Sequence, residues 1–197
     1  MSPRRYRMSQ RAASTEDTRR RIVEATFALH AEKGVAATTF RDISERADVG
    51  IGTIYQHFPS YEHVIEACGK HAFAVMRPPH EDIFEGTTGL EQRVRLLVRE
   101  LFALYQRFPV FGRIRDERHQ FEAIERAMTS EEQNRRTLIA AAFRGARASE
   151  RSRSLAFALL DMDVYQSLRH CGIEHDAAVD EITNVLLARV RSKRRAT

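Results

Sequence analysis

Apolar residues recur at helical spacing along nearly the whole chain. Ile22, Ala25 and Leu29 repeat every three or four positions, and the repeat ends at Gly34, a residue that readily adopts the left-handed conformation found at helix ends. This helix is expected to begin at Ser14–Thr15, because these residues favour the N-cap and two acidic residues follow them. No stretch shows the strict alternation typical of a half-buried strand. The pattern therefore predicts an all-α protein.

Two short helices follow, separated by a three-residue turn. The pattern predicts them at 39–47 and 51–57, and Asp48-Val49-Gly50 forms the turn. The stretch 77–89, with two prolines and two glycines, interrupts the helical pattern and is the best domain boundary. The polar segment 148–154 is expected to be a connection. The remaining helices are predicted at 60–76, 90–108, 110–128 (as one helix or two), 130–147, 155–171 and 176–191.

The composition is that of a folded, soluble protein. Of 197 residues, 43% are hydrophobic and 30% charged, which is enough for a sizeable core. No apolar run approaches the roughly 18 residues that span a membrane, and no apolar segment follows the N-terminal arginines. We therefore expect a cytoplasmic protein with no membrane association. Cys68 and Cys171 lack the spacing of a zinc site or a disulfide framework.

Positive charge is concentrated at the two ends of the chain. The net charge is +5, yet residues 1–13 alone carry four arginines and no acid, and residues 188–197 carry five basic residues and no acid. The part between them is therefore mildly acidic. Basic arms of this kind, here 1–13 and a short tail at 193–197, often bind nucleic acid, although a solvated terminus has the same composition.

Residues 39–58, TFRDISERADVGIGTIYQHF, have the spacing of a helix-turn-helix. Their apolar positions would pack the two short helices against the helix before them, and a second helix this short fits the major groove of DNA. A three-helix packing unit that does not contact DNA would have the same spacing. The residues left to point outward are Arg41, Ile51, Thr53, Tyr55, Gln56 and His57.

The stretch from residue 18 to about residue 67 contains a further set of recognisable elements. They are an Ile-x-x-Ala in the first helix, Gly34, Thr38-Thr39, Asp42-Ile43, Ala47-x-Val49 and Gly52-Thr53-Ile54-Tyr55-x-His57-Phe58. With these elements the stretch resembles the N-terminal domain of the TetR (tetracycline repressor) family. The resemblance implies an all-helical, dimeric transcription factor, usually a repressor. It would have a DNA-binding domain at 14–59, a connecting helix at 60–76 and a larger domain at 77–192 for ligand binding and dimerisation.

The same resemblance suggests roles for individual residues. Thr39 would contact a phosphate and Arg41 would read the groove, where its guanidinium can donate two parallel hydrogen bonds to guanine. Tyr55 and His57 would bind phosphates. The whole set of expected DNA-contacting residues is Thr39, Arg41, Gly50, Ile51, Gly52, Thr53, Tyr55, Gln56, His57 and Tyr61.

Five positions depart from the family's pattern. His30 replaces a large apolar residue, Asp48 replaces a glycine, and Gly50 and Ile51 replace a capping serine and a lysine. Tyr61 stands where the family often has a phosphate-binding lysine. These changes lower the local positive charge, which the arginines of the N-terminal arm could restore through phosphates or the minor groove.

Neither an enzyme nor a metal site is expected. Asp116 and His119 have the helical spacing of a ligand pair, and His63 and His71 lie near acidic and basic neighbours on one helix, but neither group has a second half. The chain contains no Gly-x-Ser-x-Gly, no His-Glu-x-x-His and no glycine-rich phosphate loop. We therefore predict a protein that works without a metal or a covalent cofactor.

The last two predicted helices are apolar on two faces each. One face suits the core of the domain, and the other suits the same pair of helices in a second subunit. A homodimer through 155–171 and 176–191 would form a two-fold four-helix bundle, although burial of both faces within one subunit would also explain the pattern.

The helices between 90 and 171 carry more large apolar side chains than one small core needs. Together with a few polar groups, they predict a pocket for a small hydrophobic effector, whose binding would act through the helix 60–76 and release a palindromic operator in double-stranded DNA. A helical ligand-binding or enzymatic protein that has lost DNA recognition is the alternative. The expected pocket residues are Leu97, Leu101, Tyr105, Phe108, Phe111, His119, Phe121, Phe143, Met162, Tyr165, Gln166 and Arg169.

Overall fold

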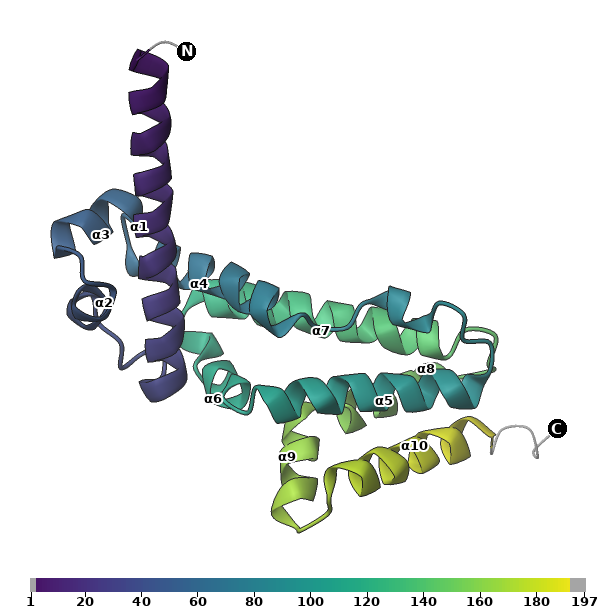
Figure 1. The fold of residues 1–197 in the computed structure, drawn as a ribbon. Helices are drawn as coiled ribbons and strands as arrows, with labels where there is room; N and C mark the ends of the chain where they lie inside the picture. The colour runs from purple at the N-terminus through teal and green to yellow at the C-terminus, as the bar shows by residue number, and fades with distance from the viewer. Residues whose placement is uncertain (1–2, 192–197) are drawn as a thin grey trace. The chain divides into compact units, whose positions relative to one another are not determined.

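The computed structural model describes the backbone of residues 3–191 and the side chains of residues 13–190. Within this part of the chain all regular structure is helical, which confirms the predicted fold class (Figure 1). None of these helices is long and apolar enough to cross a membrane. The helices are α1 (Pro3–Lys33), α2 (Phe40–Ala47), α3 (Ile51–His57), α4 (Tyr61–Met76), α5 (Leu90–Arg107), α6 (Phe111–Asp116), α7 (Glu122–Ala142), α8 (Glu150–Leu159), α9 (Met162–His170) and α10 (His175–Arg191), with short 3-10 turns at Glu81–Phe84 and Arg118–Gln120.

The chain forms two compact units that are not simply consecutive. The N-terminal unit comprises residues 1–75 together with 113–128, and the C-terminal unit comprises 76–112 and 129–197. The expected boundary after residue 76 places the segment 113–128 in the larger domain, whereas the structure groups that segment with the N-terminal unit. Helix α7 contributes residues to both units.

The core of the N-terminal unit joins α1 to the two short helices that follow it. Ile22 of α1, Ile43 of α2 and Ile54 of α3 are all fully buried, and Phe58 closes the cluster directly after α3. Residues Ile43 and Ile54 are the apolar positions that the helix-turn-helix spacing predicts to face inward. The boundaries of α2 and α3 match the sequence expectation to within one residue.

Helix α1 is longer than the sequence pattern predicts. It begins at Pro3, so the expected start at Ser14–Thr15 is wrong. Proline at the first helical position is compatible with a helix because its missing N–H would have no partner there, and residues 4–13 contain neither glycine nor proline. From Pro3 to Ala13, the basic arm is therefore a continuation of α1.

A partly buried chain of hydrogen bonds connects α1 and α4. The Tyr61 hydroxyl donates to the carbonyl of Val35 (2.8 Å), so it accepts from Nε2 of His30 (3.0 Å). This leaves Nδ1 of His30 to accept from the Cys68 thiol (3.5 Å). Burial lowers the pKa of His30 to about 4 and raises the pKa of Cys68 to about 12, so both groups are neutral at physiological pH.

The segment 113–128 closes the C-terminal end of α1. The guanidinium of Arg113 donates to the carbonyls of Ala31 and Glu32, which are among the last carbonyls of the helix. The carboxylate of Glu117 accepts hydrogen bonds from the backbone amides of Val35 (2.7 Å) and Ala36 (3.1 Å). One short segment therefore provides a cation for the helix end and an anion for the turn after it.

Gly34 is the residue that lets this carboxylate approach. Its φ of 91° lies in the left-handed region, and a Cβ built there would lie 2.6 Å from Oε1 of Glu117. The position therefore excludes a side chain both by conformation and by space. The sequence correctly marks Gly34 as the helix end but gives no sign of its partner.

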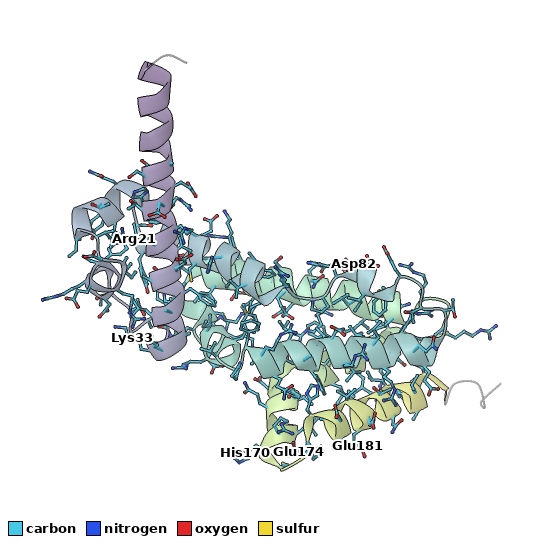
Figure 2. All side chains as sticks on the ribbon, in the orientation of Figure 1. Arg21, Lys33, Asp82, His170, Glu174 and Glu181 are labelled. Atoms are coloured by element: carbon cyan, nitrogen blue, oxygen red, sulfur yellow. The ribbon has the colours of Figure 1, made fainter. Side chains whose placement is uncertain are left out.

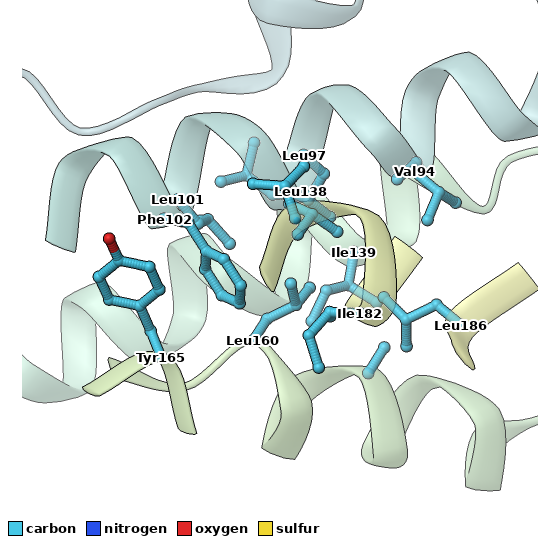
Figure 3. Close-up of a cluster of buried hydrophobic side chains, with 14 of the residues drawn as sticks. Val94, Leu97, Leu101, Phe102, Leu138, Ile139, Leu160, Tyr165, Ile182 and Leu186 are labelled. Carbon is cyan, nitrogen blue, oxygen red and sulfur yellow. The ribbon is translucent and has the colours of Figure 1, made fainter. Parts of the chain in front are cut away.

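In the C-terminal unit, α5 lies at the centre of the apolar core (Figure 3). Leu97 and Phe102 of α5 pack with Leu138 of α7, Leu160 and Ile182 in a cluster whose members are almost entirely buried. Helix α5 packs against both α9 and α10. The C-terminal unit thus has a continuous apolar core of its own.

Three predicted boundaries in the C-terminal half are wrong. Helix α7 runs without a break from Glu122 to Ala142, across the gap expected near residue 129. Most of the polar segment 148–154 is helical, because α8 begins at Glu150, where Ser149 caps it by accepting a hydrogen bond from the amide of Ser152. The expected single helix 155–171 is divided at residues 160 and 161.

The break between α8 and α9 has a visible physical cause. Asp161 caps α9 through the amide of Asp163 (3.0 Å), and its other carboxylate oxygen binds the guanidinium of Arg135 (2.8 Å). The carbonyl of Leu160 accepts from both Arg135 (3.2 Å) and the Tyr105 hydroxyl (3.0 Å). Because these two donors come from α7 and α5, the break depends on residues distant in sequence.

We predict that Glu117→Ala will destabilise the N-terminal unit. Removing the carboxylate leaves the amides of Val35 and Ala36 without their acceptor, and the Val35 side chain beside them is buried, so the cost should be about 1–3 kcal/mol in urea unfolding. Glu122→Ala is the matched control, because that side chain is 89% exposed and pairs only with Arg126. Equal stability of the Glu117→Ala and Glu122→Ala variants would show that the hydrogen bonds of Glu117 to these amides do not stabilise the unit.

Candidate nucleic-acid interface

Helix α2 begins with a complete capping box. The Thr39 hydroxyl oxygen accepts from the amide of Asp42 (3.2 Å), while the carboxylate of Asp42 accepts from the amide (2.7 Å) and the hydroxyl (2.6 Å) of Thr39. Lys33 lies 2.7 Å from the same carboxylate. The ammonium group of Lys33 and these hydrogen bonds hold the pKa of Asp42 well below its usual range. The cap therefore stays charged and fixes the first turn of α2.

The turn between α2 and α3 is held from two sides. Asp48 adopts a left-handed conformation with φ of 51°, as the turn requires of the residue that replaces glycine. The Ser44 hydroxyl donates to the carbonyl of Val49 (2.6 Å). From the other side, the Arg21 guanidinium of α1 donates to the carbonyls of Ala47 and Asp48, the latter at 2.8 Å (Figure 2).

Helix α3 presents an open outer face. Ile54 is buried beneath it, whereas Ile51 and Tyr55 are 44% and 52% exposed although both are large and apolar or aromatic. A Cβ built on Gly52 would meet no atom within 4 Å, so the backbone there is accessible. The Tyr55 ring packs edge-on against Phe40 of α2 with 4.8 Å between centroids. This contact fixes the orientation of the Tyr55 ring and so the direction of its hydroxyl.

Arg41 lies on the exposed side of α2 and pairs with Glu45. The guanidinium Nε is 3.1 Å from the carboxylate, and the two side chains are 82% and 69% exposed. Such a pair contributes less than about 1 kcal/mol in water, so an external acceptor for Arg41 competes with it readily. Sequence reasoning overlooked Glu45, although its spacing of four residues from Arg41 is the signal for a helical ion pair.

Most of the expected DNA-contacting residues lie on the surface formed by α2, the turn and α3. Thr39, Arg41, Gly50 and Gln56 are exposed, like the α3 residues described above, and Thr53 and His57 are half-buried. Tyr61 differs, since its hydroxyl is used by Val35 and His30 inside the unit. Arg21, which the sequence analysis did not single out, stabilises the turn through its hydrogen bonds from α1. The run Arg19-Arg20-Arg21 gave no indication of which arginine would face inward.

The surface is poor in positive charge for a surface that would bind DNA. Residues 14–68 contain six lysines and arginines against nine acidic residues. Lys33 is paired with Asp42, and Arg46 lies 2.7 Å from Glu32. Exposed hydrogen-bonding groups are present on α2 and α3, but residues 14–68 offer no net positive charge that would attract phosphates over a distance.

The expected effector-binding residues are divided between the two units. His119 and Phe121 belong to the N-terminal unit, where Phe121 packs against Tyr61 and the His119 side chain is 84% exposed. In the C-terminal unit, Phe108 and Phe111 are half-buried. Six others are buried parts of the apolar core: Leu97, Leu101, Tyr105, Phe143, Met162 and Tyr165.

The two expected polar residues of the effector site are used locally. The amide nitrogen of Gln166 lies 3.3 Å from the carbonyl of Pro109, and the guanidinium of Arg169 donates to the carbonyl of Ile173 and pairs with Glu174. Arg169 thereby fixes the turn between α9 and α10. Among the described residues, no group of three or more histidine, cysteine, aspartate or glutamate side chains could hold a metal ion.

Comparison with known proteins agrees with this reading of the N-terminal unit. The family model described as "Bacterial regulatory proteins, tetR family" matches residues 22–68. The chain is 33% identical over 95 residues to the HTH-type transcriptional repressor KstR of Mycobacterium tuberculosis, covering 48% of this chain and 43% of that protein. For KstR of Rhodococcus jostii the identity is 33% over 100 residues, covering 48% and 44%. The chain therefore matches less than half the length of these relatives.

Solved structures with low sequence identity share the fold over most of the chain. The multidrug binding protein EbrR, complexed with imidazole, aligns with a TM-score of 0.63 at 18% identity, covering 87% of this chain and 89% of EbrR. The regulator FadR from Bacillus subtilis, in complex with stearoyl-CoA, aligns with a TM-score of 0.62 at 16% identity, covering 86% and 98%. The similarity therefore includes the C-terminal helices as well as the matched N-terminal stretch.

We predict that Arg21→Ala will loosen the turn between α2 and α3. Loss of the charged donor to Ala47 and Asp48 should cost about 1–3 kcal/mol and speed amide exchange in residues 47–50. Arg20→Ala removes the same charge from the next position, but Arg20 is 57% exposed and pairs only with nearby acids of α1, so it should cost less than about 1 kcal/mol. Identical exchange in both variants would show that Arg21 does not hold the turn.

Proposed function

Because this chain belongs to the tetR family of bacterial regulatory proteins, we propose that it is a transcriptional repressor that binds a palindromic operator as a homodimer and leaves it when a small hydrophobic molecule binds the C-terminal unit. The observation that carries the proposal is the outer face of α3. There, Ile51 and Tyr55 remain exposed over a fully buried Ile54, and Gly52 leaves the backbone open. Because Ile51 and Tyr55 are four residues apart, they lie next to each other on one face of α3, and such a shared apolar and aromatic surface suits contact with a partner.

The proposed interface divides its work between two helices. Arg41 reads a base edge from α2, since its guanidinium leaves the exposed Glu45 pair at small cost and can donate two hydrogen bonds to guanine. Tyr55 and His57 contact the phosphate backbone, while Ile51 and Thr53 supply apolar and hydroxyl contacts in the groove. Thr39 can donate to a phosphate only by giving up its hydrogen bond to Asp42.

Dimerisation is proposed through the helices that end the chain. On these helices Leu155 of α8 and Val185 of α10 are 36% and 46% exposed, while Ala156 and Leu186 next to them are buried in the core of the unit. Each helix therefore uses one apolar face internally and keeps a second available. A two-fold partner presenting the same pair of helices would cover that second face.

The effector is proposed to bind among the aromatic residues of the C-terminal unit. Phe102 and Tyr165 lie with ring centroids 4.8 Å apart, and Tyr105 lies 6.3 Å from each of them. Regulators of this family bind small ligands, and the structurally similar proteins FadR and EbrR have been solved in complex with stearoyl-CoA and proflavin, respectively. An apolar or amphipathic molecule is the class that such side chains would accept. Helix α4, which runs to the boundary between the units, is the proposed lever.

The proposal is tested by a mobility-shift titration of the full chain against the DNA upstream of its own gene. Saturable binding that survives excess unrelated DNA is expected, at a stoichiometry of two chains per palindrome. If the purified, folded protein binds no duplex even at low salt, the proposal fails and the alternative of a helical protein without DNA recognition replaces it.

We predict different consequences for Arg41→Ala and Tyr55→Phe. Loss of Arg41 should weaken operator binding by about 1–3 kcal/mol and relax base preference at one position of each half-site, since a bidentate base contact disappears. Tyr55→Phe keeps the ring packed against Phe40 and removes only a proposed phosphate contact, so it should weaken all sequences alike. Both are measured by footprinting on the operator and on mutated operators. Unchanged operator affinity of Arg41→Ala would remove that residue from the reading surface.

We predict that an apolar compound which raises the melting temperature will also release DNA. Thermal-shift screening of hydrophobic compounds should find a saturable ligand, and operator affinity should fall as that ligand saturates the protein. Tyr165→Ala should abolish the thermal shift, and the control Ser167→Ala, at an exposed position two residues further along α9, should preserve it. A tight ligand that leaves DNA affinity unchanged would contradict the induction mechanism.

A further inference from the structure

The N-terminal turns of α1 combine two unusual features in one segment. Residues 1–13 carry four arginines and no acid, and from Pro3 onward they continue α1 without a break. Figure 1 shows these turns extending past α2 and α3, which belong to the same compact unit. We propose that this helical extension, residues 3–13, is a DNA-backbone-binding arm that follows the phosphates beside the operator half-site. The proposal rests on the proposed function, because its partner is double-stranded DNA.

The first argument is the helical phase of the four arginines. Positions 4, 5, 7 and 11 each precede a buried core position of the same helix by 18 residues, which is five turns at 3.6 residues per turn. Those core positions face α2 and α3, so the arginine positions lie on the side of α1 that carries the helix-turn-helix, about 27 Å further along the axis. The corresponding core residues are Ile22, Val23, Ala25 and Leu29.

The second argument is the distribution of the other charges on α1. Asp17 and Glu24 lie on the opposite side of the helix, where Arg20 pairs with both of them at 2.6 Å and 3.0 Å. On the arginine side, the turns between the arm and the core carry hydroxyl residues, including Ser14 and Thr18. Glu16 lies only about 20° around the helix from position 5, so the side that is free of carboxylates from position 4 to Thr18 is the one that carries positions 4, 7 and 11. Such a side suits contact with an anion.

The third argument is the unfavourable accumulation of positive charge at the start of α1, which a bound anion would relieve. The N-terminal end of a helix carries partial positive charge, and the first turn of α1 contains no acidic residue to balance it. Four arginines in the first three turns add to that charge. A helix start of this composition is stabilised when phosphates lie beside it, so binding and helix order should reinforce each other.

The fourth argument is that residues 14–68 lack the net positive charge that binding to DNA requires. Residues 14–68 have a net charge of −3, and the arm with its charge of +4 reverses the sign of the N-terminal unit at the end where α3 is exposed. The base-reading side chains then lie on α2 and α3, and the counterion-releasing charges lie on α1. Affinity and sequence preference would thus be supplied by different elements.

The experiment compares four full-length proteins on a duplex of about 40 base pairs from the upstream region and on a scrambled duplex. The first is the parent, and the second replaces all four arginines of the arm by alanine. The third and fourth keep the arginines and insert two or four alanines after Ala13. Two residues rotate the arginine positions by about 200°, whereas four rotate them by only about 40°. Circular dichroism and thermal unfolding confirm that all four proteins fold alike.

The quadruple variant should lower the slope of log affinity against log salt by about 3.6 per bound chain on both duplexes. Between 50 and 200 mM salt, the parent should therefore lose roughly 100-fold more affinity than this variant. The two-alanine insertion should resemble the quadruple variant, and the four-alanine insertion should retain most of the parent's slope.

Three outcomes would overturn the proposal, and they are distinguishable. An unchanged slope for the quadruple variant would mean that the arm contacts no phosphates. Equal slopes for the parent and the two-alanine insertion would mean that any contact does not depend on the helical face. If the parent binds neither duplex, both the arm and the proposed repressor function fail, whereas the first two results leave the repressor function standing.

Discussion

Helices α2 and α3 are too short to be stable in isolation, so the exposed surface of the N-terminal unit depends on their packing against α1. They contain eight and seven residues, well below the roughly 12–15 at which an isolated helix becomes even marginally stable in water. Burial of Ile43 and Ile54 against Ile22 supplies what helix propensity cannot. The capping box at Thr39 and the guanidinium of Arg21 then fix where α2 begins and how the turn leaves it.

The end of α1 is fixed in turn by a segment from much later in the chain. Arg113 and Glu117 complete the hydrogen bonds at that end, about 80 residues away in sequence, and the carboxylate of Glu62 accepts from the amide of Ala123 close by. Helix α7 begins in this segment and continues into the C-terminal unit, whose core is proposed to bind a ligand.

The sequence analysis is accurate where the determining interactions are local in sequence, and it fails where they join residues distant in sequence. The helix-turn-helix was predictable because its signals are local: apolar spacing, the Thr39 cap and a short turn all lie within 20 residues of one another. The early start of α1 was missed because a good local cap at Ser14–Thr15 is overridden by continued helix formation before it. The break at Leu160 was missed because its carbonyl is held by Arg135 and Tyr105, which no local pattern connects to it.

The position of Tyr61 shows why a family pattern does not by itself assign a role. A lysine at this place would extend toward phosphate, whereas the tyrosine turns its hydroxyl to Val35 and His30 and packs its ring against Phe121. His30, the other departure nearby, is the partner that makes this possible. Two departures from the family pattern that look independent in the sequence, His30 and Tyr61, thus form one hydrogen-bonded arrangement. In place of a lysine on the surface, this position holds a side chain that is hydrogen-bonded within the N-terminal unit.

The packing of the C-terminal unit limits how an effector could act there. Six of the residues expected to line its site are 3% exposed or less, so a ligand among them must bind a conformation in which this core has opened. Its apparent affinity is then reduced by the fraction of molecules in that conformation. Only a ligand with different affinities for the closed and opened conformations of the core can shift the equilibrium between them. A tightly packed core therefore favours a weakly binding but strongly coupled effector over one that fills a preformed cavity.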